Sequence, residues 1–147
     1  MTSMTPQTTL DSLLARFAAA DCSWISSVRP DGRVHSVPVW HCWASGRVYV
    51  ATTGNAVKVG NIASNPHVVI ALPDPLDPFI IEGVAAVRPI VMPEVAALFK
   101  AKYDWDPTTD AGYSALIEIR PSKVIAWGKY GDGRWTAADI SELYAAH

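Results

Sequence analysis

The sequence lacks any apolar run that approaches the roughly 20 residues a membrane-spanning helix needs. Its first ten residues, MTSMTPQTTL, have neither the basic nor the apolar region of a signal peptide. Only two cysteines are present, Cys22 and Cys42, and they lack CxxC spacing. Such cysteines are typical of reduced, buried thiols, with a disulfide as the alternative. A cytoplasmic protein with no membrane partner is therefore expected.

The sequence also lacks a large excess of positive or negative charge. The chain has 12 Lys and Arg against 14 Asp and Glu, a formal net charge of −2. No broad basic field exists for duplex DNA, so no nucleic-acid partner is expected, although a local basic cluster could hold a small anion. At 147 residues, 50% hydrophobic and 18% charged, the chain can fold as a single domain over residues 1–147. Residues 1–8 are polar and expected to be flexible.

Several enzyme motifs are absent. The sequence contains no G-x-S-x-G nucleophile elbow, no GxGxxG and no P-loop. His41 and Cys42 are neighbours on a predicted strand and would point to opposite faces, so they are not expected to pair. The histidines form no HExxH or HxH pattern, and Asp104, Asp106 and Asp110 lack the glycine and glutamate of an EF-hand. We therefore expect no catalytic side chain and no metal site.

What is present is a series of short strands separated by turns. Apolar spacing predicts helices over residues 9–20, 58–64, 93–102 and 136–146. Strand-like runs cover residues 22–28, 34–43, 47–52, 67–72, 79–87, 114–120 and 124–127, the last two interrupted near Pro121. Because strands and helices do not strictly alternate, the predicted fold class is mainly β with peripheral helices, as a six- to seven-stranded antiparallel barrel.

A few residues carry local predictions. Arg29-Pro30-Asp31-Gly32 predicts a turn that closes a hairpin. Pro38 cannot donate to a strand ladder, so its strand is expected at an edge or at a bulge. Gly83, inside a strand, indicates a bulge or a close backbone approach. Thr136 and Asp139 have the spacing of a capping box.

The most informative block is residues 33–72, in which strands give way to a polar break. Thr52, Thr53, the amides around Gly54-Asn55 and Lys58 at the start of a short helix would supply the donors that a phosphate needs. The alternative is an ordinary polar turn with an exposed lysine. Just before it, the strand Val37-Pro38-Val39-Trp40 could place main-chain groups and an indole against a flat heterocycle. Core packing is the competing role for that tryptophan.

Four segments occur in a fixed order between about residues 10 and 128: ISSVRPDGRVHSVPVW, VYVATTGNAVKVGNIASNPHVVIAL, FIIEGVAAV and IEIRPSKVIAW. Together they resemble the pyridoxamine 5′-phosphate oxidase-like split β-barrels, which bind flavin or deazaflavin. The segment AKYDWDP resembles the short, stand-alone branch, many of whose members use a deazaflavin. The resemblance implies a split barrel that forms a homodimer with the cofactor at the interface.

The resemblance also implies a set of cofactor-binding residues. The strand residues that would run along the ring are Val37, Pro38, Val39 and Trp40. The residues that would bind the phosphate are Thr52, Thr53 and Lys58. Asn61 would support the loop, and Trp127 would lie near the cofactor, often that of the other subunit.

Two departures from the family pattern narrow the function. Val57 stands where the true oxidase has an arginine, and the oxidase's substrate signature is not visible after Trp127. The resemblance therefore implies a reductase-branch oxidoreductase that uses FMN, or alternatively an 8-hydroxy-5-deazaflavin coenzyme, to transfer a hydride to or from an unidentified small-molecule substrate. A non-catalytic protein that binds or sequesters a flavin, deazaflavin or haem-type ligand is the alternative. A degenerate, purely structural dimeric module is a third reading.

Overall fold

A single antiparallel sheet that curls on itself forms the centre of the computed structural model, which describes residues 5–88 and 92–145. The strands are β1 Ser23–Val28, β2 Val34–Val39, β3 Cys42–Ala44, β4 Arg47–Thr52, β5 His67–Ala71, β6 Phe79–Arg88, β7 Ala115–Ala126 and β8 Gly133–Thr136. The helices are α1 Pro6–Ala19, α2 Val57–Ser64, α3 Pro93–Tyr103 and α4 Ala137–Ala145, with a 3-10 turn at Pro107–Thr109. The predicted mainly-β split barrel with peripheral helices is confirmed.

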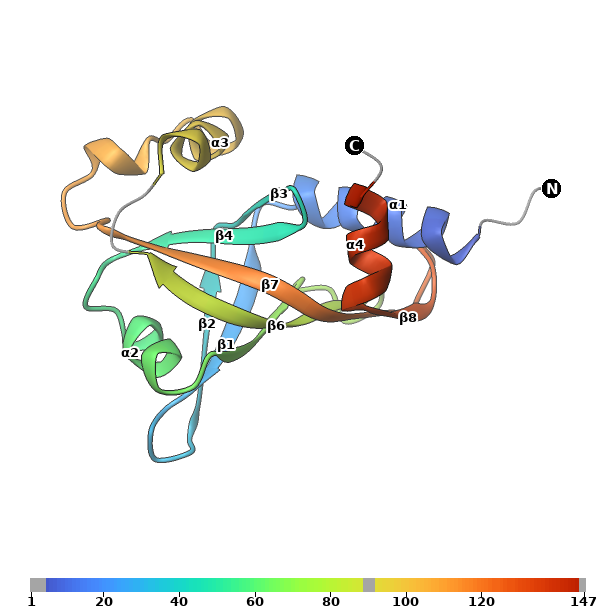
Figure 1. Ribbon diagram of the computed structural model, residues 1–147, viewed down its shortest axis with the longest axis horizontal. Coiled ribbons are helices and arrows are strands. Elements are labelled where there is room, and N and C mark those ends of the chain that lie inside the picture. Colours follow the sequence, from blue (N-terminus) through green and yellow to red (C-terminus); the bar gives the residue numbers. More distant parts are fainter. Residues whose placement is uncertain (1–4, 89–91, 146–147) are drawn as a thin grey trace.

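The strand order explains the curl of the sheet. It runs β2-β1-β5-β6-β7-β4-β3, and β8 pairs with β7. The two edge strands, β2 and β3, are joined in the chain by only Trp40 and His41, so the ends of the sheet must lie close together. In Figure 1, α1 and α4 lie together at one end of the sheet, and α2 and α3 lie toward the other.

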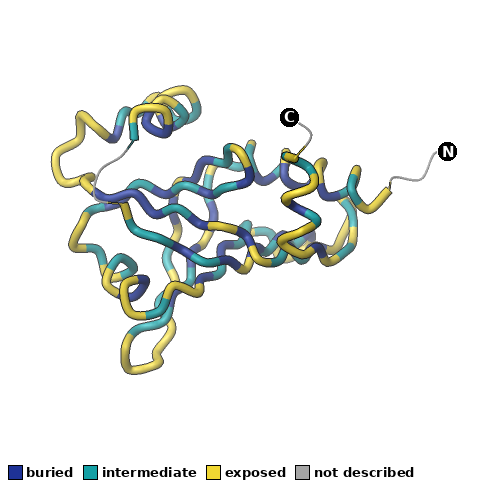
Figure 2. Tube along the Cα trace, in the orientation of Figure 1, coloured by how far each residue is buried: buried dark blue, intermediate teal, exposed yellow. Residues whose placement is uncertain are grey.

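One continuous core fills the inside of the curled sheet. α1 contributes an apolar stripe at helical spacing, Leu10, Leu13, Leu14 and Phe17, and all four side chains are buried. Figure 2 shows the buried residues gathered along the strands and the exposed ones in turns and on outer helix faces. A second, smaller cluster packs α3 against the outer side of β3 and β7 through residues that include Phe99 and Leu116.

Several local predictions are confirmed. Gly32 has φ +89° and its amide donates to the Arg29 carbonyl, which closes the hairpin between β1 and β2. β2, which contains Pro38, is an edge strand of the sheet. The register between β6 and β7 shifts between Glu82 and Gly83, so the predicted bulge is present. At the start of α4, the amide of Thr136 donates to Asp139 and the amide of Asp139 to the Thr136 hydroxyl.

Other predictions are wrong for identifiable reasons. α1 begins at Pro6 instead of residue 9, because the Thr5 hydroxyl accepts from the Thr8 amide and proline suits the first turn. Residues 6–8, expected to be flexible, are therefore helical, and Met1 to Met4 lie outside the described residues. No strand break occurs at Pro121: β7 is continuous, because the bulge at Gly83 accommodates the proline opposite it.

The predicted strand over residues 34–43 is in fact two strands, which the Trp40-His41 break separates. β8 was not expected, because its short segment, GRWT, gives little strand signal. It is fixed by tertiary packing: Trp135 is buried in the main core and its Nε1 donates to the Pro6 carbonyl at 3.1 Å. In the described part of the chain, no helix combines the length and apolar character needed to cross a membrane.

Candidate cofactor site

A cavity of about 500 Å³ opens where the ends of β2 and β4 meet α2, α3 and the loop that follows α3. Five of the nine predicted cofactor-binding residues line it: Pro38, Val39, Trp40, Thr52 and Lys58. The structure thus brings together the two halves of the predicted site, the strand that would face a flat ring and the polar break that would hold a phosphate. Its volume falls within the range of roughly 300–1,000 Å³ typical of small-molecule sites.

The other four predicted residues do not line this cavity. The side chain of Val37 packs against the main core, one residue before the end of β2 that reaches the cavity. Thr53 follows β4 and its carbonyl accepts from the Ala56 amide at 3.2 Å. Asn61 is buried and its Nδ2 donates to the Ser27 hydroxyl at 3.0 Å, which fastens α2 to β1.

Trp127 lies on the surface just after β7, and its side chain is 52% exposed. Its amide donates to the Pro78 carbonyl at 3.3 Å, so the backbone is anchored while the indole faces outward. Within one chain it therefore takes no part in the cavity. Its predicted contact with a cofactor remains a prediction that involves a second copy.

The polar side of the cavity is built around Lys58, the second residue of α2. Its side chain is half-buried, and desolvation holds the pKa of its ammonium below the ordinary value. Within residues 5–88 and 92–145, no carboxylate lies within 4.0 Å of this ammonium. A half-buried cation with no acidic partner favours the binding of an anion. The alternative expected from the sequence, a polar turn with a fully exposed lysine, does not match the half-buried Lys58.

Neighbouring backbone and hydroxyl groups complement this charge. Thr52 ends β4 and is buried at the cavity wall. Ala56 precedes α2 and provides no side-chain cap, so the first amides of that helix have no side-chain acceptor. Helix N-termini with unpaired amides attract anions, and α2 places Lys58 in that same first turn. The donor set suits one phosphate group.

The opposite wall is aromatic. The rings of Trp40 and Trp105 meet edge to face with centroids 5.9 Å apart, and Trp105 meets Tyr113 in the same way at 4.9 Å. Phe99 of α3 adds a third contact to Trp105 at 5.9 Å. Trp40 is 50% exposed, so core packing, the competing role for this residue, does not apply to it. A wall of this kind offers faces and edges to a planar, conjugated ligand.

The loop after α3 supplies lining residues that the sequence interpretation missed. Trp105, Asp110 and Tyr113 all line the cavity, as does Phe99 of the helix itself. Asp110 accepts from Trp105 Nε1 at 3.0 Å, so this carboxylate positions the indole. The missed signal was the density of aromatic residues over residues 99–113, which is high for the exposed end of a helix and the loop that follows it.

The Trp40-His41 break determines how Trp40 reaches the cavity. His41 is fully buried and stacks on Phe17 at 4.1 Å. Its Nε2 lies 2.8 Å from the Phe17 carbonyl, which can only accept, so Nε2 carries the proton and Nδ1 accepts from the Ser23 hydroxyl at 2.8 Å. Burial lowers the pKa of His41 to about 4, and the ring is neutral at pH 7. With His41 directed into the core, Trp40 is directed outward.

Comparison with known proteins agrees with this architecture. The family described as "Pyridoxamine 5′-phosphate oxidase" matches residues 10–128. A general stress protein 26 from Bacillus anthracis superposes with a TM-score of 0.65 at 22% identity, covering 86% of this chain and 96% of that one. An F420 reductase superposes with a TM-score of 0.61 at 22% identity, covering 72% and 90% of the two chains. Among curated proteins, none matches the chain significantly.

A haem binding protein from Mycobacterium smegmatis also superposes, with a TM-score of 0.71 at 18% identity. It covers 97% of this chain, but this chain spans only 62% of its length. At these identities the solved structures share the fold alone. The fold and the cavity thus define a split-barrel protein with a cavity of the size that small molecules occupy. The match over residues 10–128 goes further: the chain belongs to the pyridoxamine 5′-phosphate oxidase family.

Proposed function

We propose that the chain binds FMN, or an 8-hydroxy-5-deazaflavin coenzyme, in the cavity between α2 and α3 and acts as an oxidoreductase on a small molecule. The observation that carries this proposal is the half-buried Lys58 ammonium, which faces the same cavity as the exposed Trp40 indole and has no acidic partner among the described residues. The residues present therefore fit both ends of such a cofactor. When bound, the cofactor would supply hydride transfer.

The chain's own residues would bind the cofactor, orient it and shield it from solvent. Lys58, Thr52 and the first amides of α2 would hold the phosphate, with one cation fewer than the oxidase pattern because residue 57 is valine. The main chain of Pro38 and Val39 would run along the ring. The aromatic wall would limit the access of water and oxygen. No side chain is assigned a catalytic role, since the protein's task here is positioning.

A homodimer with two such cavities is part of the proposal. In one chain the cavity opens to the surface, and the Trp127 indole is exposed. A second copy packed over the opening would bring its Trp127 toward the ring and complete the site, leaving a narrow entrance for the small-molecule substrate. Size measurement of the purified protein, with and without cofactor, tests this part.

A second function has a specific observation in its favour. A protein that binds or sequesters a ligand without turnover needs the aromatic cavity but no substrate machinery, and the fold is shared with a haem binding protein. Turnover discriminates the two: stoichiometric binding without reduction of any quinone or enone acceptor would favour the binder. A purely structural module is the third hypothesis. A Lys58 ammonium held in a salt bridge would favour it, and among the described residues Lys58 has no such partner.

The test is a titration of the purified chain with FMN and with the deazaflavin coenzyme, followed by fluorescence quenching and by the visible absorbance spectrum. We expect saturable binding of at least one. A Kd above about 100 μM for both, near −5.5 kcal/mol, would refute cofactor binding. Lys58→Ala is expected to weaken binding by about 1.5–3 kcal/mol, the usual contribution of a charged hydrogen bond. Lys123→Ala, on β7 outside the cavity, is the matched control.

A further inference from the structure

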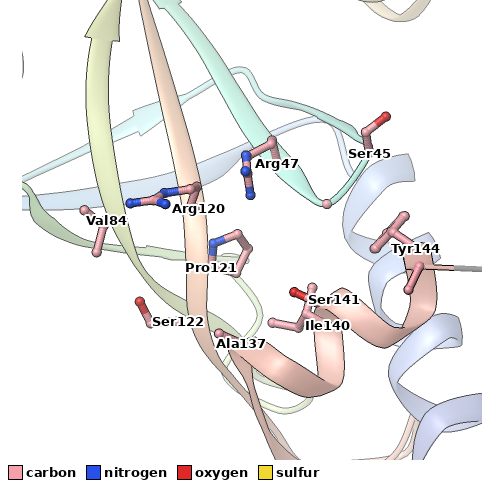
Figure 3. A pocket seen from close by; sticks show the side chains of 12 residues that line it. Ser45, Arg47, Val84, Arg120, Pro121, Ser122, Ala137, Ile140, Ser141 and Tyr144 are labelled. Carbon is pink, nitrogen blue, oxygen red and sulfur yellow. The ribbon is translucent and has the colours of Figure 1, made fainter.

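A second cavity, of about 530 Å³, lies at the other end of β4, between the outer face of the sheet and α4. Figure 3 shows the side chains of Arg47 and Arg120 on one side of this space and Ile140, Ser141 and Tyr144 of α4 on the other. Arg47 begins β4 and Thr52 of the cofactor cavity ends it. Five residue steps along the strand place their Cα atoms roughly 16 Å apart, so the two cavities are distinct sites.

The two arginines occupy an unfavourable arrangement. In the β4–β7 ladder Val48 pairs with Ile119, and continuing this register by one residue sets Arg47 opposite Arg120. Guanidinium groups are always charged, and like charges directly opposite each other on neighbouring strands are destabilising. Within the described part of the chain, no carboxylate lies within 4.0 Å of either guanidinium. Neither guanidinium therefore has an ion-pair partner at contact distance in these residues, and Glu118, two residues before Arg120 on the same face, is the nearest acidic position along β7.

Polar and apolar groups line the cavity beside the two arginines, as in a site for a small ligand. Ser122 of β7 and Ser141 of α4 add hydroxyl groups to the lining, and Pro121 and Ile140 add apolar contacts. The apolar contacts suit a short carbon skeleton, while guanidinium forks match the oxygens of a phosphate. The next position along the same face of β7 differs: Glu118, two residues before Arg120, is paired with Arg88 at 3.3 Å.

From this cavity we propose a second, separate binding site, for a small organic phosphate, in which Arg47 and Arg120 share the anionic group. The site does not depend on the cofactor cavity and would exist whether or not the chain binds a flavin. The bound phosphate would relieve the cross-strand repulsion, so occupancy should stabilise the fold.

The experiment uses inorganic phosphate as the probe, at pH 8, with sodium chloride matching the ionic strength in the reference. The full chain carries Lys58→Ala, so that phosphate at the cofactor cavity does not contribute. We expect a saturable rise in Tm and saturable heat in calorimetry. Arg47→Gln and Arg120→Gln should each weaken the affinity about tenfold or more. Arg134→Gln, an exposed strand arginine outside the cavity, should leave it unchanged.

Without phosphate, Arg47→Gln and Arg120→Gln should unfold at the same or a higher Tm, because each removes a like-charge neighbour. A lower Tm in both would show that the arginines stabilise the empty fold and would overturn the proposal. So would a non-saturating rise common to all variants, or equal affinity in the arginine variants. If phosphate does not saturate and Arg120→Gln instead changes the fraction of dimer in sedimentation, the arginines belong to an interface between copies, and the proposal fails.

Discussion

The indole of Trp40 lies parallel to the phenol ring of Tyr103, with centroids 4.6 Å apart and planes inclined by 4°. The Tyr103 hydroxyl lies 2.8 Å from the carbonyl oxygen of His41 and accepts from the His41 amide at 3.1 Å. Lys102 donates to the same carbonyl at 2.8 Å. The end of α3 thus holds both residues of the break, one by stacking and one by hydrogen bonds, and thereby sets the geometry of the aromatic wall.

Tyr103→Phe keeps the stack and removes the hydroxyl. We expect a loss of about 1 kcal/mol or somewhat more in the free energy of unfolding, because the His41 and Asp21 carbonyls lose a shared donor. Urea denaturation measures it. Tyr130→Phe, an exposed tyrosine whose ring lies under Arg16, is the control and should change little. An unchanged free energy in Tyr103→Phe would mean that the hydroxyl contacts do not hold the break.

The buried His41 should make stability depend on pH. Its folded pKa of about 4 lies below the ordinary 6.5, so as pH falls through 6.5 the unfolded chain takes up a proton that the folded chain refuses. Its contribution to stability is therefore complete above pH 6.5, is lost between about pH 6.5 and 4, and changes no further below. Between pH 7 and pH 5 the loss is about 2 kcal/mol.

The measurement is the free energy of unfolding of the wild type and of His41→Gln at pH 7 and pH 5. The variant is less stable at pH 7, because it loses the ring stack, but its loss between the two pH values should be smaller by about 2 kcal/mol. Equal losses in the two proteins would contradict a neutral, buried His41.

Gly83 should resist substitution because of packing, since its φ is not in the left-handed region. An added Cβ would lie 2.6 Å from Cγ2 of Ile119 and 2.7 Å from the Arg120 carbonyl oxygen, and the backbone atom cannot move aside cheaply. We expect Gly83→Ala to lower the free energy of unfolding by about 1–3 kcal/mol, as overpacking does. Gly60→Ala in α2 meets nothing within 4 Å and should instead stabilise by about 0.5–1 kcal/mol. Chemical denaturation of both variants would show opposite signs; a shared sign would refute the bulge argument.

Trp40→Ala tests the aromatic wall. If the indole shields or stacks against a planar ligand, its removal should weaken cofactor binding by about 0.5–1.5 kcal/mol. Calorimetry is the suitable measurement, because it does not depend on tryptophan fluorescence. Trp24→Ala removes an indole of similar exposure, 43% against 50%, from a strand position outside the cavity. Equal effects in the two variants would assign Trp40 a general role in stability.

Some parts of the fold and of the candidate site could be predicted from the sequence, and others could not. Pro38 predicts an edge strand because a missing donor is a local property, and Thr52 with Lys58 predicts an anion site because the donors are close in sequence. Trp105 and Tyr113 could not be placed, because their position depends on α3 packing against residues of distant strands. The continuity of β7 at Pro121 could not be predicted either, because it depends on Gly83 in the neighbouring strand β6.

The two-residue connection between β2 and β3 couples the motions of the cavity to those of the core. Since Trp40 forms the wall and His41 is directed into the core beside Phe17, the backbone that carries the wall cannot move outward without drawing a buried imidazole toward solvent. Opening of this wall and global unfolding should then be one kinetic event. The His41 amide, hydrogen-bonded to Tyr103, should exchange its hydrogen only as fast as the whole chain unfolds, while exchange at the tip of the β1–β2 hairpin should proceed far faster.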